Sequence, residues 1–484
     1  MRRSDGSGPL SGVRVIGESE VGPRRAVALG VEDGRYHAHV VGATGSGKST
    51  LLANLALADM AAGRGVVVID PKGDLVDDLL ARLPEQSLGR VVLIDPKETE
   101  APPALNVLGG EPAEVAVDHV VSVFARIFAA WWGPRTDDVL RSACATLRRL
   151  PGATLADIPV LLTDRRFRAP LVATLPERSE LKGFWDGYDA LSPAGQAQAI
   201  GPIMNKLRAV LARRFARDLF GSARSSFDVK AVLSGGMLLA RLPKGTLGED
   251  TARLVGALLV ASVWQAATAR ADDVARPDAT LYVDECQNFL APPTAVDDVL
   301  AEARGYHLSV VLAHQHLGQL PKDLFEAASA NARNKVYFSV SPEDARVLAR
   351  HTEPYLTAYD LSHLDAYQVA CRLVVGGRDL HAFTLRTRPM PPAVPGRAAE
   401  AREHARKNAG RSQADRRHDL LVRRRRHRTK TDGGPAGVTE GVSSGVSPGV
   451  SAGVLETPTP PRENRQRKAL PTPASEDPDS WSNP

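Results

Sequence analysis

The feature that most constrains the fold is a glycine-rich segment, Gly42-Ala-Thr-Gly-Ser-Gly-Lys-Ser49. The short run 37–41 before it reads as a β-strand, and residues 49–62 after it, rich in leucine and alanine, read as a helix. The segment fits the pattern G-x-x-x-x-G-K-[S/T], and a strand before it and a helix after it are the context that this pattern needs. A glycine-rich turn with a chance lysine is the alternative, which this context disfavours. We therefore expect an α/β core with a phosphate-binding P-loop.

Each part of this loop has an expected role in binding ATP and Mg²⁺. Glycines let the backbone curl so that successive N–H groups face the phosphates at the positive end of the following helix. Lys48 bridges the β- and γ-phosphates, and Ser49 offers its hydroxyl to Mg²⁺. The expected nucleotide-binding residues are Gly42, Ala43, Thr44, Gly45, Ser46, Gly47, Lys48, Ser49 and Thr50.

Three further apolar runs end in acidic residues. They are Val66–Asp70, Val91–Asp95 and Leu281–Glu285. Short runs rich in β-branched residues, apolar on both faces, are typical of a buried parallel sheet. More strands of the same kind are expected at 309–315, 336–340 and 369–375.

The acidic pair at the end of the third run is the candidate for catalysis. Asp284 would hold Mg²⁺, directly or through water, and Glu285 would orient and deprotonate the attacking water. The same carboxylates could instead only end a strand near helix N-termini. Asp70 and Asp95 compete for the role, but only Asp284 is followed by a glutamate.

Two further residues are weaker candidates on local sequence. Gln315 closes the run 309–315, where a polar side chain faces the crevice at the carboxyl ends of the strands, so it could sense the γ-phosphate or position water; it could also be an ordinary loop residue. His314 and His316 beside it lack the spacing of metal ligands. Arg304 ends a helix expected at 296–304, with Gly305 as its C-cap, and alone reads as a helix-terminal arginine.

A long stretch between the second and third acidic runs has almost no strand signal. Helices are expected at 113–128, 137–149, 197–219 and 251–271, and a strand at 236–242 returns the chain to the core. This pattern predicts an all-α insertion within the ATPase core. The expected boundaries are 1–110 for the first part of the core, 111–228 for the insertion, 229–390 for the second part of the core, and 391–484 for a disordered, basic, low-complexity tail.

Charge and composition bear on partners and location. Residues from 391 onward hold 17 Lys and Arg against 11 Asp and Glu, so the tail carries +6 and the rest of the chain −1. Two basic regions could contact DNA, the tail at 416–430 and a helical group consisting of Lys206, Arg208, Arg213, Arg214 and Arg217. A solvated helix face is the alternative for the group, and a solubilising segment is the alternative for the tail.

A cytoplasmic protein is expected. Three scattered cysteines without C-x-x-C spacing argue against disulfides and zinc. No run approaches the length of about 20 apolar residues that spans a bilayer. A Gly-Val repeat at 437–454 is too polar and glycine-rich to form a core.

Several blocks, read together, resemble one family. They are A-T-G-S-G-K-S-T (43–50), V-I-D-P-K-G-D-L (68–75), L-N-V-L (105–108), W-G-P-R-T-D-D-V-L-R (132–141), L-P-K-G-T-L-G-E-D (242–250), Y-V-D-E-C-Q-N-F (282–289), E-A-R (302–304) and A-H-Q (313–315). In this order they resemble the type IV coupling proteins of conjugation and secretion, the TraG/TraD-like members of the FtsK/HerA-like superfamily of P-loop translocases. The similarity runs from about residue 36 to 388, and the second and sixth blocks are its most specific parts.

The resemblance implies a RecA-like core with a helical lobe, and ATP-driven translocation of DNA, single- or double-stranded, through a homo-hexamer. It also implies an arginine finger from the neighbouring subunit and a polar sensor, and the positions of Arg304 and Gln315, 20 and 31 residues after Asp284, match these. Relaxase or secretion-channel proteins are the implied partners.

One departure from the family leaves alternatives open. Coupling proteins typically carry N-terminal transmembrane helices, whereas no apolar segment precedes residue 42 here. Recruitment to the inner face of the cell membrane would then need a partner or the basic tail. A soluble HerA-like DNA-processing motor and a P-loop ATPase that exports or remodels protein remain alternatives, and a nonenzymatic nucleotide-gated adaptor is disfavoured because the loop and the acidic pair are intact.

Overall fold

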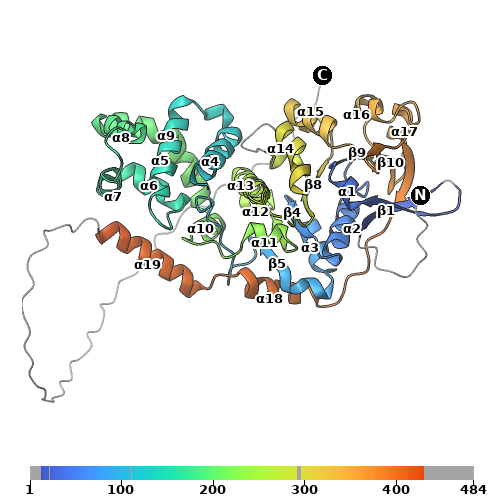
Figure 1. The fold of residues 1–484 in the computed structure, drawn as a ribbon, viewed down its shortest axis with the longest axis horizontal. Coiled ribbons are helices and arrows are strands. Elements are labelled where there is room, and N and C mark those ends of the chain that lie inside the picture. Colours follow the sequence, from blue (N-terminus) through green and yellow to red (C-terminus); the bar gives the residue numbers. More distant parts are fainter. Residues whose placement is uncertain (1–11, 21, 111, 291–295, 430–484) are drawn as a thin grey trace, which may run out of the picture. The chain divides into compact units, whose positions relative to one another are not determined.

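The computed structural model describes residues 12–20, 22–110, 112–290 and 296–429. Its centre is an 11-stranded sheet with the order β2-β1-β13-β10-β9-β3-β8-β7-β4-β6-β5 (Figure 1). The strands of this sheet are β1 (Val13–Ser19), β2 (Ala26–Gly30), β3 (Ala38–Val41), β4 (Gly65–Asp70), β5 (Val91–Ile94), β6 (Met237–Arg241), β7 (Ala279–Val283), β8 (Leu308–His314), β9 (Asn334–Tyr337), β10 (Gln368–Arg372) and β13 (Phe383–Thr387). A separate two-stranded ladder joins β11 (Val374–Val375) to β12 (Arg378–Asp379).

The helices of the core and the insertion connect or follow these strands along the chain. They are α1 (Val31–Gly34), α2 (Lys48–Ala61), α3 (Asp74–Leu80), α4 (Ala113–Ile127), α5 (Pro134–Arg148), α6 (Ile158–Thr163), α7 (Arg165–Val172), α8 (Glu180–Ala190), α9 (Pro193–Leu211), α10 (Arg214–Phe220), α11 (Val229–Leu233), α12 (Lys244–Leu247), α13 (Glu249–Thr268), α14 (Val296–Ala303), α15 (Lys322–Asn331), α16 (Pro342–Leu348), α17 (Ala358–Ser362), α18 (Arg397–Ala409) and α19 (Gln413–Thr429). None of the helices in the described ranges is long and apolar enough to cross a membrane.

The strands β9, β3, β8, β7, β4, β6 and β5 pair in parallel, as their apolar runs predict. Side chains alternate between two faces of this sheet. Val66 and Val68 of β4 pack with α2 and α3 in one core, whereas Val67 and Ile69 pack with α13 and α14 in the other. The expected α/β, RecA-like fold with a mostly parallel sheet is therefore confirmed.

The sequence predicted a strand at 369–375, which is β10, but it did not predict that this strand is antiparallel or that β13, β1 and β2 extend the sheet beyond it. Strand β10 pairs antiparallel with β9, and β13, β1 and β2 extend this half to the sheet edge. In β1 and β2 only part of the residues are buried, and β2 faces solvent at its first residue. These strands lack the uninterrupted apolar run of a buried strand, which is why the sequence pattern did not reveal them.

Helices α4 to α10 form a lobe, drawn in cyan to green in Figure 1, within the range predicted for the insertion. The helix expected at 197–219 is wrong as a single element, because the chain breaks at residues 212–213 into α9 and α10. Arg213, the N-cap of α10, has an extended backbone (φ −78°, ψ 126°). The apolar cores of the lobe and of one sheet face are continuous through α13, most of whose residues are buried.

The expected start of the disordered tail at residue 391 is too early. Helix α18 packs against β5, burying Ala401, Ala405 and Ala409. Arg402 pairs with the buried carboxylate of Asp95 at 2.8 Å. These alanines, at positions i, i+4 and i+8, make one narrow apolar face on an otherwise charged helix. The high charge of the segment favoured the prediction of a disordered tail, so this pattern was overlooked. The Gly-Val repeat and the last residue of the basic segment, Lys430, lie outside the described residues.

Candidate nucleotide-binding site

The glycine-rich loop joins β3 to α2 and depends on glycine at two positions. Gly47 has φ 114° and is the N-cap of α2, a conformation that other residues rarely adopt. At Gly42 a Cβ atom would lie 2.5 Å from Cβ of Phe338, so a side chain has no room. The strand-to-helix turn thus leaves the N–H groups at the start of α2 facing one point, as phosphate binding requires.

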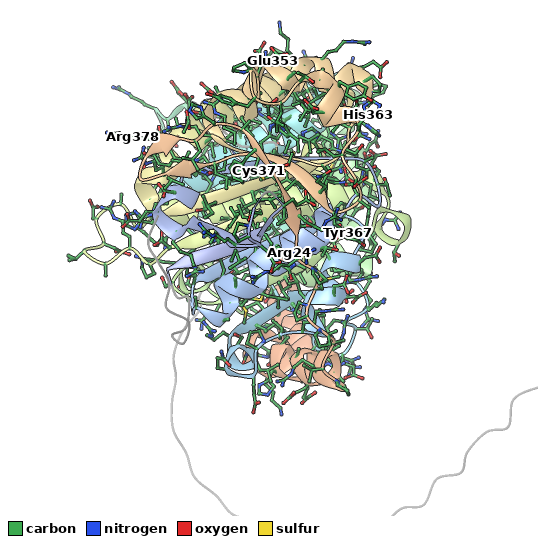
Figure 2. All side chains as sticks on the ribbon, turned by 90° about the vertical axis from the view of Figure 1, so that its right-hand side faces the viewer. Arg24, Glu353, His363, Tyr367, Cys371 and Arg378 are labelled. Carbon is green, nitrogen blue, oxygen red and sulfur yellow. The ribbon has the colours of Figure 1, made fainter. Side chains whose placement is uncertain are left out.

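Backbone hydrogen bonds fix this loop from the antiparallel half of the sheet. Ala43 N–H donates to Ser339 O at 3.2 Å, and Tyr367 N–H donates to Ser46 O at 3.1 Å. Tyr367, labelled in Figure 2 below Cys371 of β10, has φ 65° and its ring lies against Gly47. The segments that follow β9 and precede β10 therefore help to hold the loop in shape.

Lys48 is buried at the base of the loop. Its Nζ donates to Gly42 O at 2.6 Å and to Ala43 O at 3.3 Å. Burial lowers the pKa of Lys48, opposed by the negative charges of Asp284 and Glu285. The amine and the acidic pair therefore belong to one electrostatic site.

The acidic pair follows β7, beside the carboxyl ends of β4 and β8. Burial, reinforced by the nearby carboxylates of Asp70 and Glu285, raises the pKa of Asp284 to about 6. Glu285 has φ 48°, an uncommon conformation for a residue with a side chain. Its carboxylate is almost fully buried.

Glu285 is connected to the glycine-rich loop through Gln315. The Thr44 hydroxyl donates to Oε1 of Gln315 at 2.7 Å, and Nε2 of Gln315 donates to Oε1 of Glu285. Burial would raise the pKa of Glu285, but hydrogen bonds from its neighbours, Gln315 first, hold it below its ordinary value. The structure thus brings together Thr44, Gln315 and Glu285, which the sequence singled out separately.

Sequence reasoning missed two partners of this carboxylate, Lys72 and Gln287. Lys72 Nζ lies 3.0 Å from Oε1 of Glu285, and Gln287 Nε2 donates to Oε2 at 3.1 Å. Lys72 follows the carboxyl end of β4 by two residues, so its place beside β7 could have been anticipated from the order of the strands. Both residues hold Glu285 charged and oriented.

The two competing carboxylates are engaged elsewhere. Asp70 accepts backbone N–H groups of Lys72, Gly73 and Val76, so it shapes the turn into α3. Asp95 is paired with Arg402. Neither is free to take the role that the sequence also left open to them, and Asp284 is the remaining strand-end carboxylate of the three.

The residues present fit a divalent cation next to the loop. Burial first, and the carboxylates of Asp70 and Glu285 second, raise the pKa of Asp284, so a bound cation would stabilise its charged form. Ser49, in the first turn of α2, is exposed and presents a hydroxyl oxygen, and oxygen ligands are those that Mg²⁺ prefers. Ser49 and Asp284 are the residues that would hold Mg²⁺, and Thr50 is half-buried beside Ser49.

The histidines next to Gln315 are not brought together as metal ligands. His314 is buried, and its Nε2 lies 2.7 Å from Nε2 of His39. Burial lowers the pKa of His314 to about 4. The side chain of His316 is half exposed. His314 is thus a structural residue beneath the loop.

Arg304 and Gln315 lie at opposite ends of strand β8. Arg304 precedes β8, whereas Gln315 follows this strand, and β8 is seven residues long. At about 3.3 Å per residue the strand spans roughly 23 Å, so the side chain of Arg304 cannot reach the glycine-rich loop of its own chain. The guanidinium is exposed and stacks on Tyr36, with its Cζ 3.9 Å from the ring centroid.

The predicted C-cap of this helix is wrong. The chain continues from α14 into a 3₁₀ turn at Arg304–Tyr306, and His307, with φ 55°, takes the left-handed position expected for Gly305. His307 Nδ1 lies 2.7 Å from Arg276 O, a contact that offsets the strain.

Comparisons with known proteins agree with this geometry. A family model described as the central domain of the helicase HerA matches residues 16–149. This part of the chain, which holds the glycine-rich loop, is therefore similar to the HerA central domain, in line with the resemblance of the motif order to the FtsK/HerA-like translocases. No protein among the curated sequences matches the chain.

Solved structures show the same fold in proteins of distant sequence. The conjugative coupling protein TrwB, lacking its first 70 residues by its description, superposes with a TM-score of 0.55 at 16% identity, covering 76% of this chain and 88% of that one. Its complex with ADP and Mg²⁺ gives 0.53 at 17% identity, covering 77% and 89%. VirB4 of Thermoanaerobacter pseudethanolicus gives 0.52 at 13% identity, covering 81% and 98%.

Proposed function

We propose that this chain is an ATP-hydrolysing DNA translocase that acts as a coupling protein in conjugative, type IV secretion-like DNA transfer. The observation that carries the proposal is the connection from Thr44 through Gln315 to Glu285, which links the phosphate-binding loop to a charged, oriented carboxylate. The TrwB-like fold supports it. Relaxase or secretion-channel proteins are the partners proposed for such a role.

The loop and its lysine hold the nucleotide. The N–H groups at the start of α2 bind phosphate oxygens, and Lys48 exchanges its bonds to the carbonyls of Gly42 and Ala43 for bonds to the β- and γ-phosphates. These carbonyl groups already accept hydrogen bonds from the buried amine, so Lys48 is positioned before ATP binds. Ser49 and Asp284 would hold Mg²⁺, which would supply positive charge to the phosphate oxygens.

Glu285 acts as the general base for the attacking water. Its lowered pKa keeps it charged at neutral pH, and Lys72 and Gln287 fix its orientation. Gln315 contacts both the loop and Glu285, so a change at the γ-phosphate alters the setting of the base. This makes Gln315 the sensor of the nucleotide state.

Arg304 completes the site of a neighbouring subunit. Its distance from its own loop leaves no role in cis, and its exposed guanidinium supports contact with a second copy. An arginine supplied in trans stabilises the charge of the transferring phosphoryl group. A closed homo-hexamer in which each subunit donates one finger to the next fits these requirements.

A soluble HerA-like motor that processes DNA is the second candidate. The match of residues 16–149 to the HerA central domain favours it specifically, because this region includes the loop and the first part of the lobe. The cytoplasm, or the inner face of the cell membrane through a partner, is the proposed location.

The test measures the ATPase rate of the purified full chain with and without DNA. DNA should raise the rate, and Glu285→Gln, which removes the base but keeps the loop, should abolish both rates and so control for contaminating ATPases. A rate indifferent to single- and double-stranded DNA but raised by a protein substrate would contradict the proposal in favour of a protein-remodelling ATPase.

A further inference from the structure

Two basic helices that are far apart in sequence, α10 and α19, lie side by side where the helical lobe ends. Helix α10 closes the lobe, and α19 follows the core helix α18 (Figure 1). A pocket of about 340 Å³ lies between α10 and the start of α19. Its charged lining consists of Arg214, Arg217, Arg416, Asp218 and Asp419.

Two of the three arginines are held in place by backbone carbonyl groups. Arg214 donates to Thr99 O at 3.1 Å, and Arg416 donates to Arg411 O at 2.6 Å and to Glu100 O at 3.1 Å. The Arg416 side chain is largely buried. These contacts fix the guanidinium groups before any ligand arrives, which reduces the entropy lost on binding.

The third arginine is available to a ligand. Arg217 is exposed, and its guanidinium makes no hydrogen bond or ion pair with the described part of the chain, although its backbone N–H donates to Arg213 O within the helix. Its planar fork can therefore bind two oxygens of one anion.

The two aspartates do not neutralise this cluster. Asp218 is shared between Arg214 at 3.3 Å and Arg416 at 4.0 Å. Asp419 is taken by Arg411 at 2.8 Å and by the hydroxyl of Ser222 at 2.6 Å. The three arginines of the lining thus face two carboxylates, one of which is already paired with Arg411 outside the lining, and the pocket has an excess of positive charge.

We propose that this pocket binds phosphate groups of a DNA backbone, with Arg217 as its principal ligand. The proposal rests on the proposed function, and it places a DNA contact outside the nucleotide site, where α19 and the lobe meet. Arginine forks match phosphate geometry, and contacts of this kind position DNA without reading its sequence. The exposed Arg417, next along α19, extends the positive surface beyond the pocket.

The lining of the pocket favours DNA over an anionic membrane. An interfacial helix needs a broad apolar face. In the described part of α19 one large apolar side chain, Leu421, is exposed. The pocket itself is walled mainly by charged and small residues.

The test is binding of a fluorescently labelled oligonucleotide, single-stranded and duplex, to the full chain at several salt concentrations. Arg217→Ala should weaken binding at low salt by roughly tenfold or more, as expected for one charge-assisted bond to phosphate, and should reduce the slope of log Kd against log salt by about one. Arg217→Lys should restore part of the affinity because it keeps the charge. Arg346→Ala, an exposed arginine of α16 without an ion pair among the described residues, is the matched control and should bind like the unaltered protein.

Asp218→Asn gives a test of opposite sign. Removing this carboxylate raises the excess of positive charge, so the substitution should strengthen binding. An Arg217→Ala protein with unchanged affinity and salt slope overturns this inference alone, whereas an unaltered protein that binds no DNA overturns the proposed function as well. Loss of binding to phosphatidylserine vesicles, with DNA binding intact, would assign the pocket to a membrane instead.

Discussion

The position of Arg304 gives the sharpest prediction about assembly. Because β8 separates it from the loop of its own chain by roughly 23 Å, Arg304→Ala should leave ATP binding intact, since Lys48 and the loop amides belong to the chain that holds the nucleotide. Hydrolysis should fall about a thousandfold or more, the usual contribution of an arginine finger, which corresponds to at least about 4 kcal/mol of transition-state stabilisation.

The contact with Tyr36 sets a smaller, graded effect. The ring centroid lies 3.9 Å from Cζ of Arg304 and 4.4 Å from Cζ of Arg333, so it separates two arginines and orients the exposed one. Tyr36→Ala should lose a cation–π contact of about 0.5–1 kcal/mol and slow hydrolysis roughly two- to fivefold. Tyr36→Phe keeps the ring and should behave like the unaltered protein.

Mixing experiments decide whether Arg304 acts in trans. Equal amounts of Arg304→Ala and Lys48→Ala chains should regain part of the ATPase rate, because an interface between an intact loop and an intact finger forms where the two variants meet in the correct order. Steady-state ATPase assays on rings whose mixed composition is verified by native mass spectrometry provide the measurement. Absence of rescue in such rings, or full activity of a monomeric Arg304→Ala chain, would refute the reasoning.

The remaining predictions concern the nucleotide site, the core and the C-terminal helices. Lys48→Ala should lose nucleotide affinity, whereas Glu285→Gln should bind ATP and fail to hydrolyse it; equal loss of binding of a fluorescent ATP analogue in both would contradict the role of Glu285. Asp59→Asn should lower the free energy of unfolding, measured in urea, by about 3–5 kcal/mol, because the buried carboxylate accepts hydrogen bonds at 2.7 Å each from Arg14, Arg64 and Tyr282. Burial would raise the pKa of Asp59, but these partners outweigh it and hold the pKa below its ordinary value. The contribution of Asp59 to the free energy of unfolding should therefore be present above about pH 4 and be lost as the pH falls through the folded pKa. A difference between variant and parent that does not change with pH would count against this assignment. Deleting 391–484 should lower the melting temperature because it removes α18 and its ion pairs with Asp95 and Glu98, whereas deleting 430–484 keeps every described contact; equal melting temperatures of the two truncated proteins would show that α18 adds no stability.

Local sequence determined the nucleotide loop and the parallel sheet. A strand, a glycine-rich turn and a helix in succession define a P-loop, because the backbone conformation of Gly47 and the register of N–H groups at a helix start are local properties. Likewise, apolar runs that end in an acidic residue predicted β4, β5 and β7, because strands buried on both faces consist of uninterrupted apolar residues.

Tertiary structure decided which of the strand-end carboxylates was available. Asp70, Asp95 and Asp284 have similar local sequences but different surroundings. Asp70 accepts hydrogen bonds from the turn into α3, and Asp95 pairs with an arginine of the distant helix α18. Asp284 faces the charged groups of the nucleotide site. The link from Thr44 to Glu285 likewise depends on strand order, which places the ends of β3, β8 and β7 side by side. Contacts between residues separated by hundreds of positions are set by packing of the whole chain, and no local pattern records them.

The C-terminal helices show the same division between local and tertiary information. The charge of residues 397–429 predicted a segment that stays in solvent, because charged sequences bury too little apolar surface to fold alone. Helix α18 is ordered because the core offers what the segment lacks: an edge strand, β5, for three alanines, and two carboxylates for Arg402 and Arg406. The sequence by itself determined that α18 carries basic side chains. Only the tertiary structure decided that Arg402 and Arg406 would pair with the buried carboxylates of Asp95 and Glu98. The free energy of such an ion pair depends on a partner that the helix itself does not contain.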